Sequence, residues 1–196
     1  MRPFETHGLG ASRTLLLAVL ALAATAAVLL AMGRHPICTC GAVRLWADAH
    51  GPENSQQLLD WYTPSHVVHG LLFYAGLRLW GRVTGRALAP GRAFLAALAL
   101  EGAWEIVENT PVVVAHYRSA TIAQGYEGDS VLNSLSDMGA MSAGFVLAYR
   151  LPAAASVALA LALEVVAGVA IRDNLTLNVL MLLHPIPAIK AWQGGA

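Results

Sequence analysis

The sequence predicts an all-α protein, a polytopic transmembrane helical bundle of about five spans with a short C-terminal interfacial or re-entrant helix. Of the 196 residues, 57% are hydrophobic and only 12% are charged, whereas a soluble domain carries about 25% charged residues. Several apolar runs approach the roughly 20 residues that a helix needs to cross a bilayer. No internal repeat or low-complexity tract divides the chain, so we interpret residues 1–196 as a single integral-membrane domain.

Five apolar runs are the candidate spans. The first, residues 14–32, has the sequence TLLLAVLALAATAAVLLAM. It is longer than the core of a signal peptide, which is about 7–15 residues, so a retained helix is favoured over a cleaved one. The other predicted spans are residues 64–80, 93–109, 130–149 and 153–171.

Short-range signals indicate how several helices begin. The pair Thr63-Pro64 is typical of an N-cap followed by proline at the first helical position. Asp129 is expected to cap the fourth span, and Thr110-Pro111 is expected to end the third span and start a short interfacial helix. A ridge of small residues that permits close helix contact is formed by Ser136, Ala140 and Gly144.

Polar segments flank the spans. Residues 33–63 form a long loop, predicted to lie outside the cytoplasm. The tail NLTLNVLMLLHPIPAIKAW is short for a full span, and it can lie at the interface, re-enter the membrane or form a sixth helix. Glu164 in the fifth span is expected to contact Arg172 or Asn178.

The positions of Lys and Arg predict the orientation, because cytoplasmic segments carry an excess of them. A cytoplasmic N-terminus places seven on the inner side, namely Arg2, Arg13, Arg78, Arg82, Arg86, Arg92 and Arg150. Five then lie outside, namely Arg34, Arg44, Arg118, Arg172 and Lys190. We therefore expect a multi-pass protein of the cell inner membrane with its N-terminus in the cytoplasm.

The third span ends in an acidic run, EGAWEIVEN. Glu101, Glu105 and Glu108 are spaced i, i+4 and i+7, which places them on one helix face. An ionised side chain inside a bilayer costs about 2.5–3.5 kcal/mol on insertion scales, so such acids usually face protein or water and mark a functional site. This face is therefore the predicted centre of the protein's chemistry.

Polar residues of two other spans are expected at the same depth. His66 and His69 lie near the outer end of the second span, and Asp137 lies two turns into the fourth. Antiparallel threading predicts that they share one outward-facing cavity with the three glutamates. The candidate catalytic residues are Glu105, Glu108, Glu101 and Asp137, the candidate metal ligands are His66 and His69, and structural polar roles are assigned to Asn109, Asp129, Asn133 and Trp104.

The chemistry of this cluster has open alternatives. His66 and His69 can chelate one divalent metal ion from a single helix face, or they can hydrogen-bond the acids without a metal. The acids must be protonated, bonded to His or Asn, reached by Arg118 or Arg172, or bound to a cation.

The two cysteines also allow two interpretations. Cys38 and Cys40 follow His35 in the run HPICTC. Three soft ligands in six residues can bind zinc or copper. With no fourth ligand evident, two thiols in a loop are the favoured interpretation, because a disulfide between residues two apart would be strained.

Long stretches of the chain resemble an uncharacterised bacterial family of multi-pass inner-membrane proteins, catalogued as a domain of unknown function and a UPF family. The resemblance rests on ICTCG, SQQLLDWYTPSHVVHG, EGAWEIVEN, GDSVLNSLSD and IRDNLTLNVLMLL, and it covers nearly the whole chain beyond the first helix. It implies a location and no activity. In spacing alone, the order Asp60, His66, Tyr74, Glu101 and Asp137 is similar to that of VanZ-like membrane proteins, which are linked to glycopeptide resistance.

Three functions are compatible with these observations. The first is an enzyme that acts on a lipid or lipid-linked substrate, with a carboxylate as general base and a histidine or divalent metal polarising the substrate. The second is a small proton-coupled carrier, although the inverted repeat that carriers often have is absent from the sequence. The third is a non-catalytic membrane scaffold. The expected partner is membrane lipid, and the zero net charge argues against nucleic acid.

Overall fold

The computed structural model describes residues 9–48, 51–121 and 126–194, and within them the regular secondary structure is helical apart from one isolated β-bridge. The predicted all-α class is confirmed. The helices are α1 (Ala11–Ala31), α2 (Thr63–Thr84), α3 (Pro90–Glu108), α4 (Pro111–Ala120), α5 (Val131–Arg150), α6 (Ala153–Ile171), α7 (Leu175–Leu183) and α8 (Pro187–Gln193). Arg2, which the sequence places on the cytoplasmic side, lies outside the described residues.

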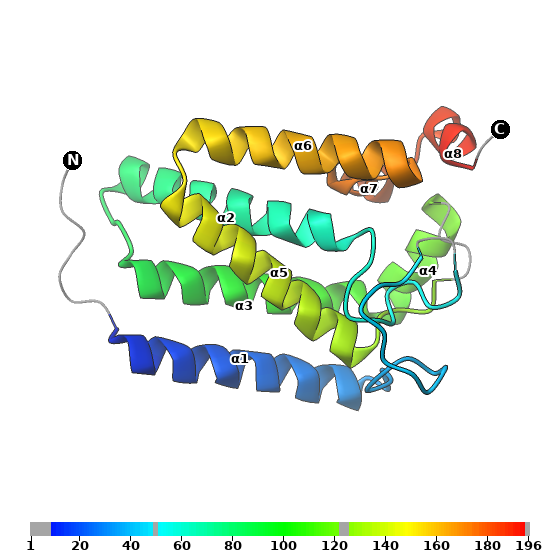
Figure 1. The fold of residues 1–196 in the computed structure, drawn as a ribbon, viewed down its shortest axis with the longest axis horizontal. Helices are drawn as coiled ribbons and strands as arrows, with labels where there is room; N and C mark the ends of the chain where they lie inside the picture. Colours follow the sequence, from blue (N-terminus) through cyan, green and yellow to red (C-terminus); the bar gives the residue numbers. More distant parts are fainter. Residues whose placement is uncertain (1–8, 49–50, 122–125, 195–196) are drawn as a thin grey trace.

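The long helices form an elongated bundle (Figure 1). Helices α1, α3, α2 and α6 run side by side, and α5 crosses them obliquely, packing mainly on α2. The loop between α1 and α2 lies at one end of this bundle together with α4, α7 and α8. The apolar core is made by α1, α3 and α5, with Ala97, Leu98, Met138 and Met141 almost fully buried.

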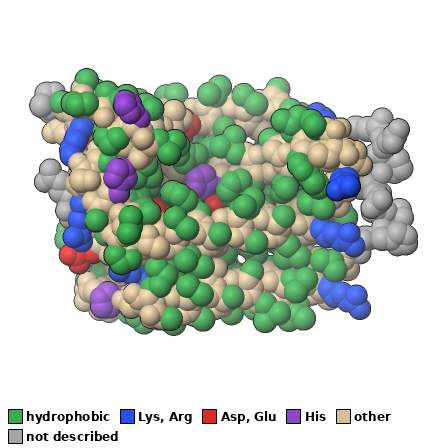
Figure 2. Space-filling model, turned by 180° about the vertical axis from the view of Figure 1, so that it is seen from behind, with side chains coloured by type: hydrophobic (Ala, Val, Ile, Leu, Met, Phe, Trp, Pro, Cys, Tyr) green, Lys and Arg blue, Asp and Glu red, His purple; other side chains and the backbone are tan. Residues whose placement is uncertain are grey.

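Three of the described helices are long and apolar enough to cross a membrane, with mean hydropathies of 2.6 for α1, 1.2 for α5 and 2.3 for α6. Helices α2 and α3 have the length but not the apolar composition, so the predicted count of about five spans is not confirmed. The outer face of α6 carries Leu161, Val165 and Val169 at 61–80% exposure. Figure 2 shows hydrophobic side chains over the length of the bundle, with Lys and Arg towards its ends. This pattern indicates a membrane protein.

The α2–α5 crossing is a backbone-to-backbone contact. A Cβ atom added to Gly70 would lie 2.0 Å from the Met141 carbonyl oxygen, and one added to Gly144 would lie 2.1 Å from the Val67 carbonyl oxygen. No side chain fits at either position. Gly144 of the predicted small-residue ridge therefore makes a close helix contact of the kind that the ridge was expected to permit.

The loop before α2 supplies the hydrogen bonds that the start of α5 needs. The Val131 N–H donates to the His35 carbonyl at 2.8 Å, and the Ser130 N–H donates to the Ser55 carbonyl at 3.0 Å. The Ser130 hydroxyl accepts the Asn133 N–H at 3.1 Å, so Ser130 is the N-cap. The prediction that Asp129 caps this helix is wrong, because its carboxylate is engaged elsewhere.

The start of α2 also differs from the prediction. Thr63 is the first helical residue rather than the N-cap, with proline in the first turn as expected. The buried Asp60 carboxylate accepts the N–H groups of Tyr62 at 2.7 Å and Thr63 at 3.2 Å. Asp60, three residues before Thr63, thus accepts the hydrogen bonds from the first backbone N–H groups of α2 that an N-cap side chain would otherwise accept. Helix α4 begins after Thr110 as expected, and the Thr110 hydroxyl caps it by accepting the Val113 N–H.

The chain after α6 folds back along it as α7, and neither α7 nor α8 is long enough to span a bilayer. Glu164 accepts the backbone N–H groups of Leu175 and Thr176, each at 3.0 Å, and so anchors the start of α7. The expected contact of Glu164 with Arg172 or Asn178 is wrong, because a carboxylate is better satisfied by the free N–H groups of a helix start.

The glycine contact predicts a selective loss of stability. Gly70→Ala forces a methyl group against the α5 backbone, so we expect destabilisation by about 1–3 kcal/mol, as for overpacked cores. Gly76→Ala on the same helix is the matched control, because nothing lies within 4 Å of a Cβ there. Thermal melting of purified protein in detergent measures both, and equal melting temperatures for the two variants would contradict the crossing.

Asp173, at the α6–α7 junction, predicts a pH dependence of stability. Burial raises its pKa to about 6, against hydrogen bonds that lower it. The folded state then binds the proton more tightly than the unfolded chain, so stability is lost as pH rises from about 4 through 6. We expect Asp173→Asn to raise the melting temperature relative to wild type more at pH 8 than at pH 5. Glu127→Gln, at a side chain that is 84% exposed, should show no such difference; the same result for Asp173→Asn would refute the prediction.

Candidate functional site

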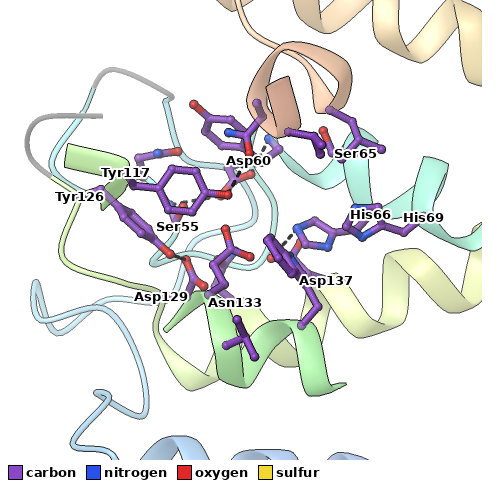
Figure 3. A pocket seen from close by; sticks show the side chains of 18 of the residues that line it. Ser55, Asp60, Ser65, His66, His69, Tyr117, Tyr126, Asp129, Asn133 and Asp137 are labelled. Atoms are coloured by element: carbon purple, nitrogen blue, oxygen red, sulfur yellow. Dashed lines mark hydrogen bonds and ion pairs between the residues drawn. The ribbon is translucent and has the colours of Figure 1, made fainter. Parts of the chain in front are cut away.

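The predicted polar residues meet in the parts of α2, α3 and α5 that lie nearest the loop between α1 and α2 (Figure 3). We call this end of the bundle the loop end. His66 and His69 come from the first two turns of α2, Asp137 comes from the second turn of α5, and the glutamates come from the last turns of α3. The sequence placed these residues at a common depth, and the structure brings them into direct contact.

Glu101 is the hub of the contacts. Its side chain is fully buried, and it lies 2.6 Å from His66 Nδ1 and 3.0 and 3.1 Å from His69 Nδ1. An ionised carboxylate only accepts hydrogen bonds, so each histidine donates its Nδ1–H. In a neutral ring, this leaves the Nε2 lone pair for a proton or a metal ion. Two imidazoles are thus held in one tautomer by one acid.

Glu105 and Asp137 lie beside His66, but the distances are too long for hydrogen bonds. His66 Nδ1 is 3.6 Å from Glu105 Oε1, and His66 Nε2 is 3.7 Å from Asp137 Oδ2. Both oxygens of Glu105 and Oδ1 of Asp137 are buried with no hydrogen-bond partner among the described residues. Buried polar atoms nearly always have a hydrogen-bond partner, so these three oxygen atoms are unusual.

Asp129 belongs to a second contact set at the end of α3. Asn109 Nδ2 donates to Asp129 Oδ2 at 2.6 Å, while Asn109 Oδ1 accepts the Asp129 N–H at 2.7 Å. The Tyr126 hydroxyl donates to Asp129 Oδ1 at 2.9 Å. Burial raises the pKa of Asp129 to about 6, although these two side-chain hydrogen bonds lower it. The structural role predicted for Asn109 is thus to hold Asp129.

The cationic partners considered from the sequence do not reach the cluster. Arg118 donates to the Tyr126 carbonyl and lies 3.5 Å from the Glu127 carboxylate. Arg172 donates to the Trp192 carbonyl at 3.0 Å. Within the described part of the chain, the ion pairs of the cluster acids run to the two histidines.

A pocket of about 450 Å³ opens beside the cluster. Among the predicted site residues, His66, His69, Trp104, Glu108, Asp129, Asn133 and Asp137 line it. Glu101, Glu105 and Asn109 lie behind this lining, fully buried. The expectation that all three glutamates line the cavity therefore holds for Glu108 alone, because Glu101 and Glu105 face inward, towards α2 and α5.

Sequence reasoning missed several pocket residues that come from loops and short helices, namely Ser55, Asp60, Tyr62, Tyr117, Tyr126 and Asn178. Burial raises the pKa of Tyr62, Tyr117 and Tyr126, so they remain neutral hydroxyl donors. Asp60 appeared in the sequence only within the VanZ-like spacing. The tyrosines carried no periodic signal, because the segments that bear them are short or irregular.

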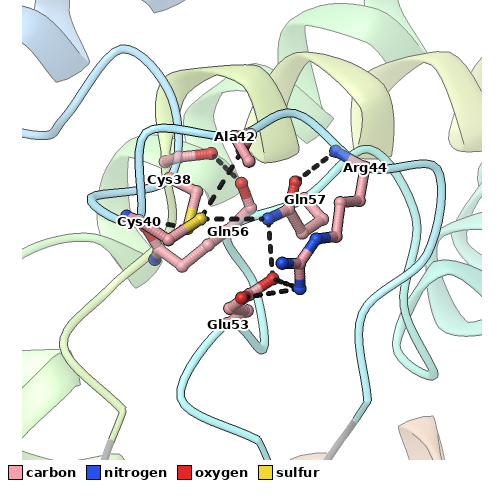
Figure 4. Close-up of a disulfide and its surroundings, with 8 residues drawn as sticks. Cys38, Cys40, Ala42, Arg44, Glu53, Gln56 and Gln57 are labelled. Carbon is pink, nitrogen blue, oxygen red and sulfur yellow. Dashed lines mark hydrogen bonds and ion pairs between the residues drawn. A yellow bond between two sulfur atoms is a disulfide. The ribbon is translucent and has the colours of Figure 1, made fainter.

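The cysteines form a disulfide between Cys38 and Cys40 (Figure 4). The favoured prediction of two free thiols is therefore wrong, and the sulfurs are not available for the alternative, a zinc or copper site with His35. The bridge lies beside the buried Gln57, which donates to Glu53 at 2.9 Å and accepts the Arg44 N–H at 2.6 Å. Local hydrogen bonding thus shapes this part of the loop.

Comparisons with known proteins agree with the sequence resemblance. The family described as "Protein of unknown function (DUF2585)" matches residues 29–195. A UPF0314 protein of Novosphingobium aromaticivorans is 51% identical over 173 residues, covering 86% of each chain. One from Sphingopyxis alaskensis is 50% identical over 192 residues, covering 95% of this chain and 98% of the relative.

These relatives have names that state no activity, and no solved structure matches this chain. A further UPF0314 protein, from Rhizobium meliloti, is 54% identical over 165 residues, covering 84% of this chain and 82% of the relative. The matches do not show the VanZ-like similarity. With a family match across most of its length and relatives at about half identity, the chain belongs to the uncharacterised DUF2585 family of UPF0314 proteins.

Proposed function

We propose that this protein is a multi-pass inner-membrane enzyme that acts by acid–base chemistry on a lipid or lipid-linked substrate. The observation that carries this proposal is the pocket, which has an acidic and imidazole end and an apolar wall. An amphipathic pocket in an apolar bundle suits a molecule with a polar head and a hydrocarbon chain.

The apolar wall supports lipid as the substrate class. It includes Leu100 and Val107 of α3, which are 52% and 48% exposed, and Leu175 and Val179 of α7. Exposed leucine and valine at a pocket wall allow a hydrocarbon chain to enter from the bilayer without crossing water. Phe73 and Trp104 extend this wall up to His69.

The depth of the pocket favours an enzyme over a carrier. Its lining comes from α2 up to Phe73, from α3 from Leu100 onwards and from α5 up to Asp137, so it lies in the half of the bundle nearest the loop. Carriers usually bind substrate near the midplane and open it to either side. A pocket at one end fits a substrate that is processed at one membrane face.

The His69–Glu101 pair is suited to proton transfer. Glu101 orients the ring through Nδ1, and His69 lines the pocket, so its Nε2 is the atom available to take a proton from a substrate or water. A buried carboxylate behind a histidine also stabilises the imidazolium that forms. The protonated ring can return the proton to the leaving group, and Glu108 and Asp137 line the same pocket end, where they face the polar part of a bound substrate.

Two observations support a cytoplasmic N-terminus with the pocket on the opposite side. The starts of α1 and α3 and the ends of α2 and α5 share one end of the bundle and bring Arg13, Arg82, Arg92 and Arg150 together. The disulfide lies at the other end, and disulfides persist in oxidising compartments such as the periplasm. With α2 and α3 counted as spans, the bundle crosses five times.

The enzyme proposal predicts a defect that depends on one imidazole. In cells lacking the gene, lipid extracts should contain an accumulated species that the wild-type protein removes. His69→Gln should insert into the membrane and fail to remove it, because the proton acceptor is lost. The matched control is His184→Gln, at an exposed histidine outside the pocket. Full restoration by His69→Gln, or no lipid difference on deletion, would argue for a scaffold or a carrier.

The topology predicts opposite labelling at the two ends. In a Cys38→Ser/Cys40→Ser background, Val43→Cys should react with a membrane-impermeant maleimide in spheroplasts, and Ala87→Cys should react only after lysis. Both positions are exposed. The background should fold, because closing a loop of three residues stabilises by only about 2 kcal/mol. The reverse labelling pattern would overturn the orientation, and loss of the double serine protein from membranes would show that the bridge is required.

A further inference from the structure

We propose that Glu105 bridges two divalent cations, one held with His66 and Asp137 and the other with Glu108 and Asp129. The starting observation is the Glu105 carboxylate, which is 1% exposed and has no hydrogen-bond partner for either oxygen among the described residues. A buried carboxylate without donors is costly, and two unpaired oxygens are what a bridging ligand offers.

The first cation position is defined by His66, Glu105 and Asp137. Each offers one ligand atom, and the three atoms lie within 4.8 Å of one another. His66 Nε2, the nitrogen not bonded to Glu101, is 3.7 Å from Asp137 Oδ2. Glu105 Oε1 lies 3.6 Å from Nδ1 of the same ring. Two ligands bound at about 2.1 Å to one ion lie roughly 3.0–3.6 Å apart, so the Nε2–Asp137 pair is close to that spacing and the Glu105 carboxylate must move towards Nε2.

Glu101 prepares His66 for this role. A histidine that binds a metal usually donates its other ring N–H to a carboxylate, which fixes the tautomer and raises the basicity of the ligating nitrogen. The 2.6 Å contact between His66 Nδ1 and Glu101 supplies that bond. Glu101 is therefore a positioning residue, and its own oxygens are already occupied by the two histidines.

The second cation position is defined by Glu105, Glu108 and Asp129, whose ligand atoms also lie within 4.8 Å of one another. Asn109 and Tyr126 each donate one hydrogen bond to Asp129, one to each oxygen. A carboxylate oxygen has a second lone pair, so Asp129 can still bind an ion while its orientation is held.

Charge explains why two ions fit better than one. Four carboxylates, from Glu105, Glu108, Asp129 and Asp137, stand together with no Lys or Arg ion pair among the described residues. Two divalent cations balance these four negative charges, and the fifth carboxylate, Glu101, is stabilised separately by the N–H groups of His66 and His69. A shared carboxylate holds such ions about 3.5–4 Å apart, as in two-metal enzymes.

The arrangement leaves room for a substrate. Four of the five ligands line the 450 Å³ pocket, and Glu105 lies behind them. Three protein ligands for each ion leave coordination positions open toward the pocket. The inference uses the pocket of the proposed enzyme but does not depend on its reaction, since ion binding can be measured without a substrate.

Manganese tests the proposal, because oxygen-rich sites with imidazole accept Mn²⁺ and neighbouring Mn²⁺ ions are magnetically coupled. The purified full-length protein is stripped with a chelator, reloaded with Mn²⁺ and desalted. We expect about two Mn²⁺ per chain by elemental analysis and an exchange-coupled electron paramagnetic resonance signal. Zero or one bound ion, or two uncoupled ions, would overturn the proposal.

Variants assign the ligands. Glu105→Gln should abolish the coupled signal, and Asp137→Asn and Asp129→Asn should each leave about one uncoupled ion, so one misfolded variant does not remove the test. Glu53→Gln, in the loop, and His69→Gln should both keep two coupled ions. Retention of the coupled pair by Glu105→Gln would refute the bridge. Coupled ions in a protein with no lipid phenotype would contradict the enzyme proposal and leave this one intact.

Discussion

The close crossing of α2 and α5 is the contact on which the rest of the structure depends. With hydrogen atoms for side chains, Gly70 and Gly144 let two backbones touch. His66 lies one turn before Gly70, and Asp137 lies two turns before Gly144. Helices held this close bring an imidazole and a carboxylate within 3.7 Å of each other. A larger residue at the crossing would separate α2 from α5 and move the residues of the cluster apart. The geometry of the site therefore depends on the packing of these two helices.

The second constraint is electrostatic. A bundle with an apolar exterior buries carboxylates on α3 and α5, and its described arginines are committed elsewhere, for example Arg118 to the loop before α5. The bundle deals with each acid differently. Glu101 is satisfied by two imidazoles, Asp129 by an amide and a phenol, and Glu105 by no hydrogen-bond donor among the described residues. Glu105, the acid without hydrogen-bond donors, marks the expected place of the chemistry, because buried polar atoms without partners are rare away from functional sites.

The loop between α1 and α2 acts as a structural part of the site rather than as a connection. Its carbonyl groups accept the first N–H groups of α5, and Asn133 of α5 donates back to the Gln57 carbonyl at 2.9 Å. Asp60, at its end, both orders the start of α2 and lines the pocket. The same hydrogen bonds that end the loop therefore set the positions of the histidines and of Asp137.

The sequence by itself determined the helical class, the approximate bounds of the long helices and the residues of the polar cluster. These features depend on local periodicity and on the cost of burying charge, and both can be evaluated along one helix. Glu101, Glu105 and Glu108 share a face whatever packs against them. The proposed span count rests on the same reasoning, but α2 and α3 are too polar for composition alone to establish it.

Only the tertiary structure decided which partner each polar atom has. Glu101 binds two histidines, Glu105 lies beside His66 without a hydrogen bond to it, and Asp129 pairs with Asn109 instead of capping α5. The disulfide and the tyrosines of the pocket also come from segments without a periodic pattern. A hydrogen bond depends on separations of a few tenths of an ångström between residues far apart in the chain. Such separations are set by how helices cross, and no local pattern in the sequence encodes them.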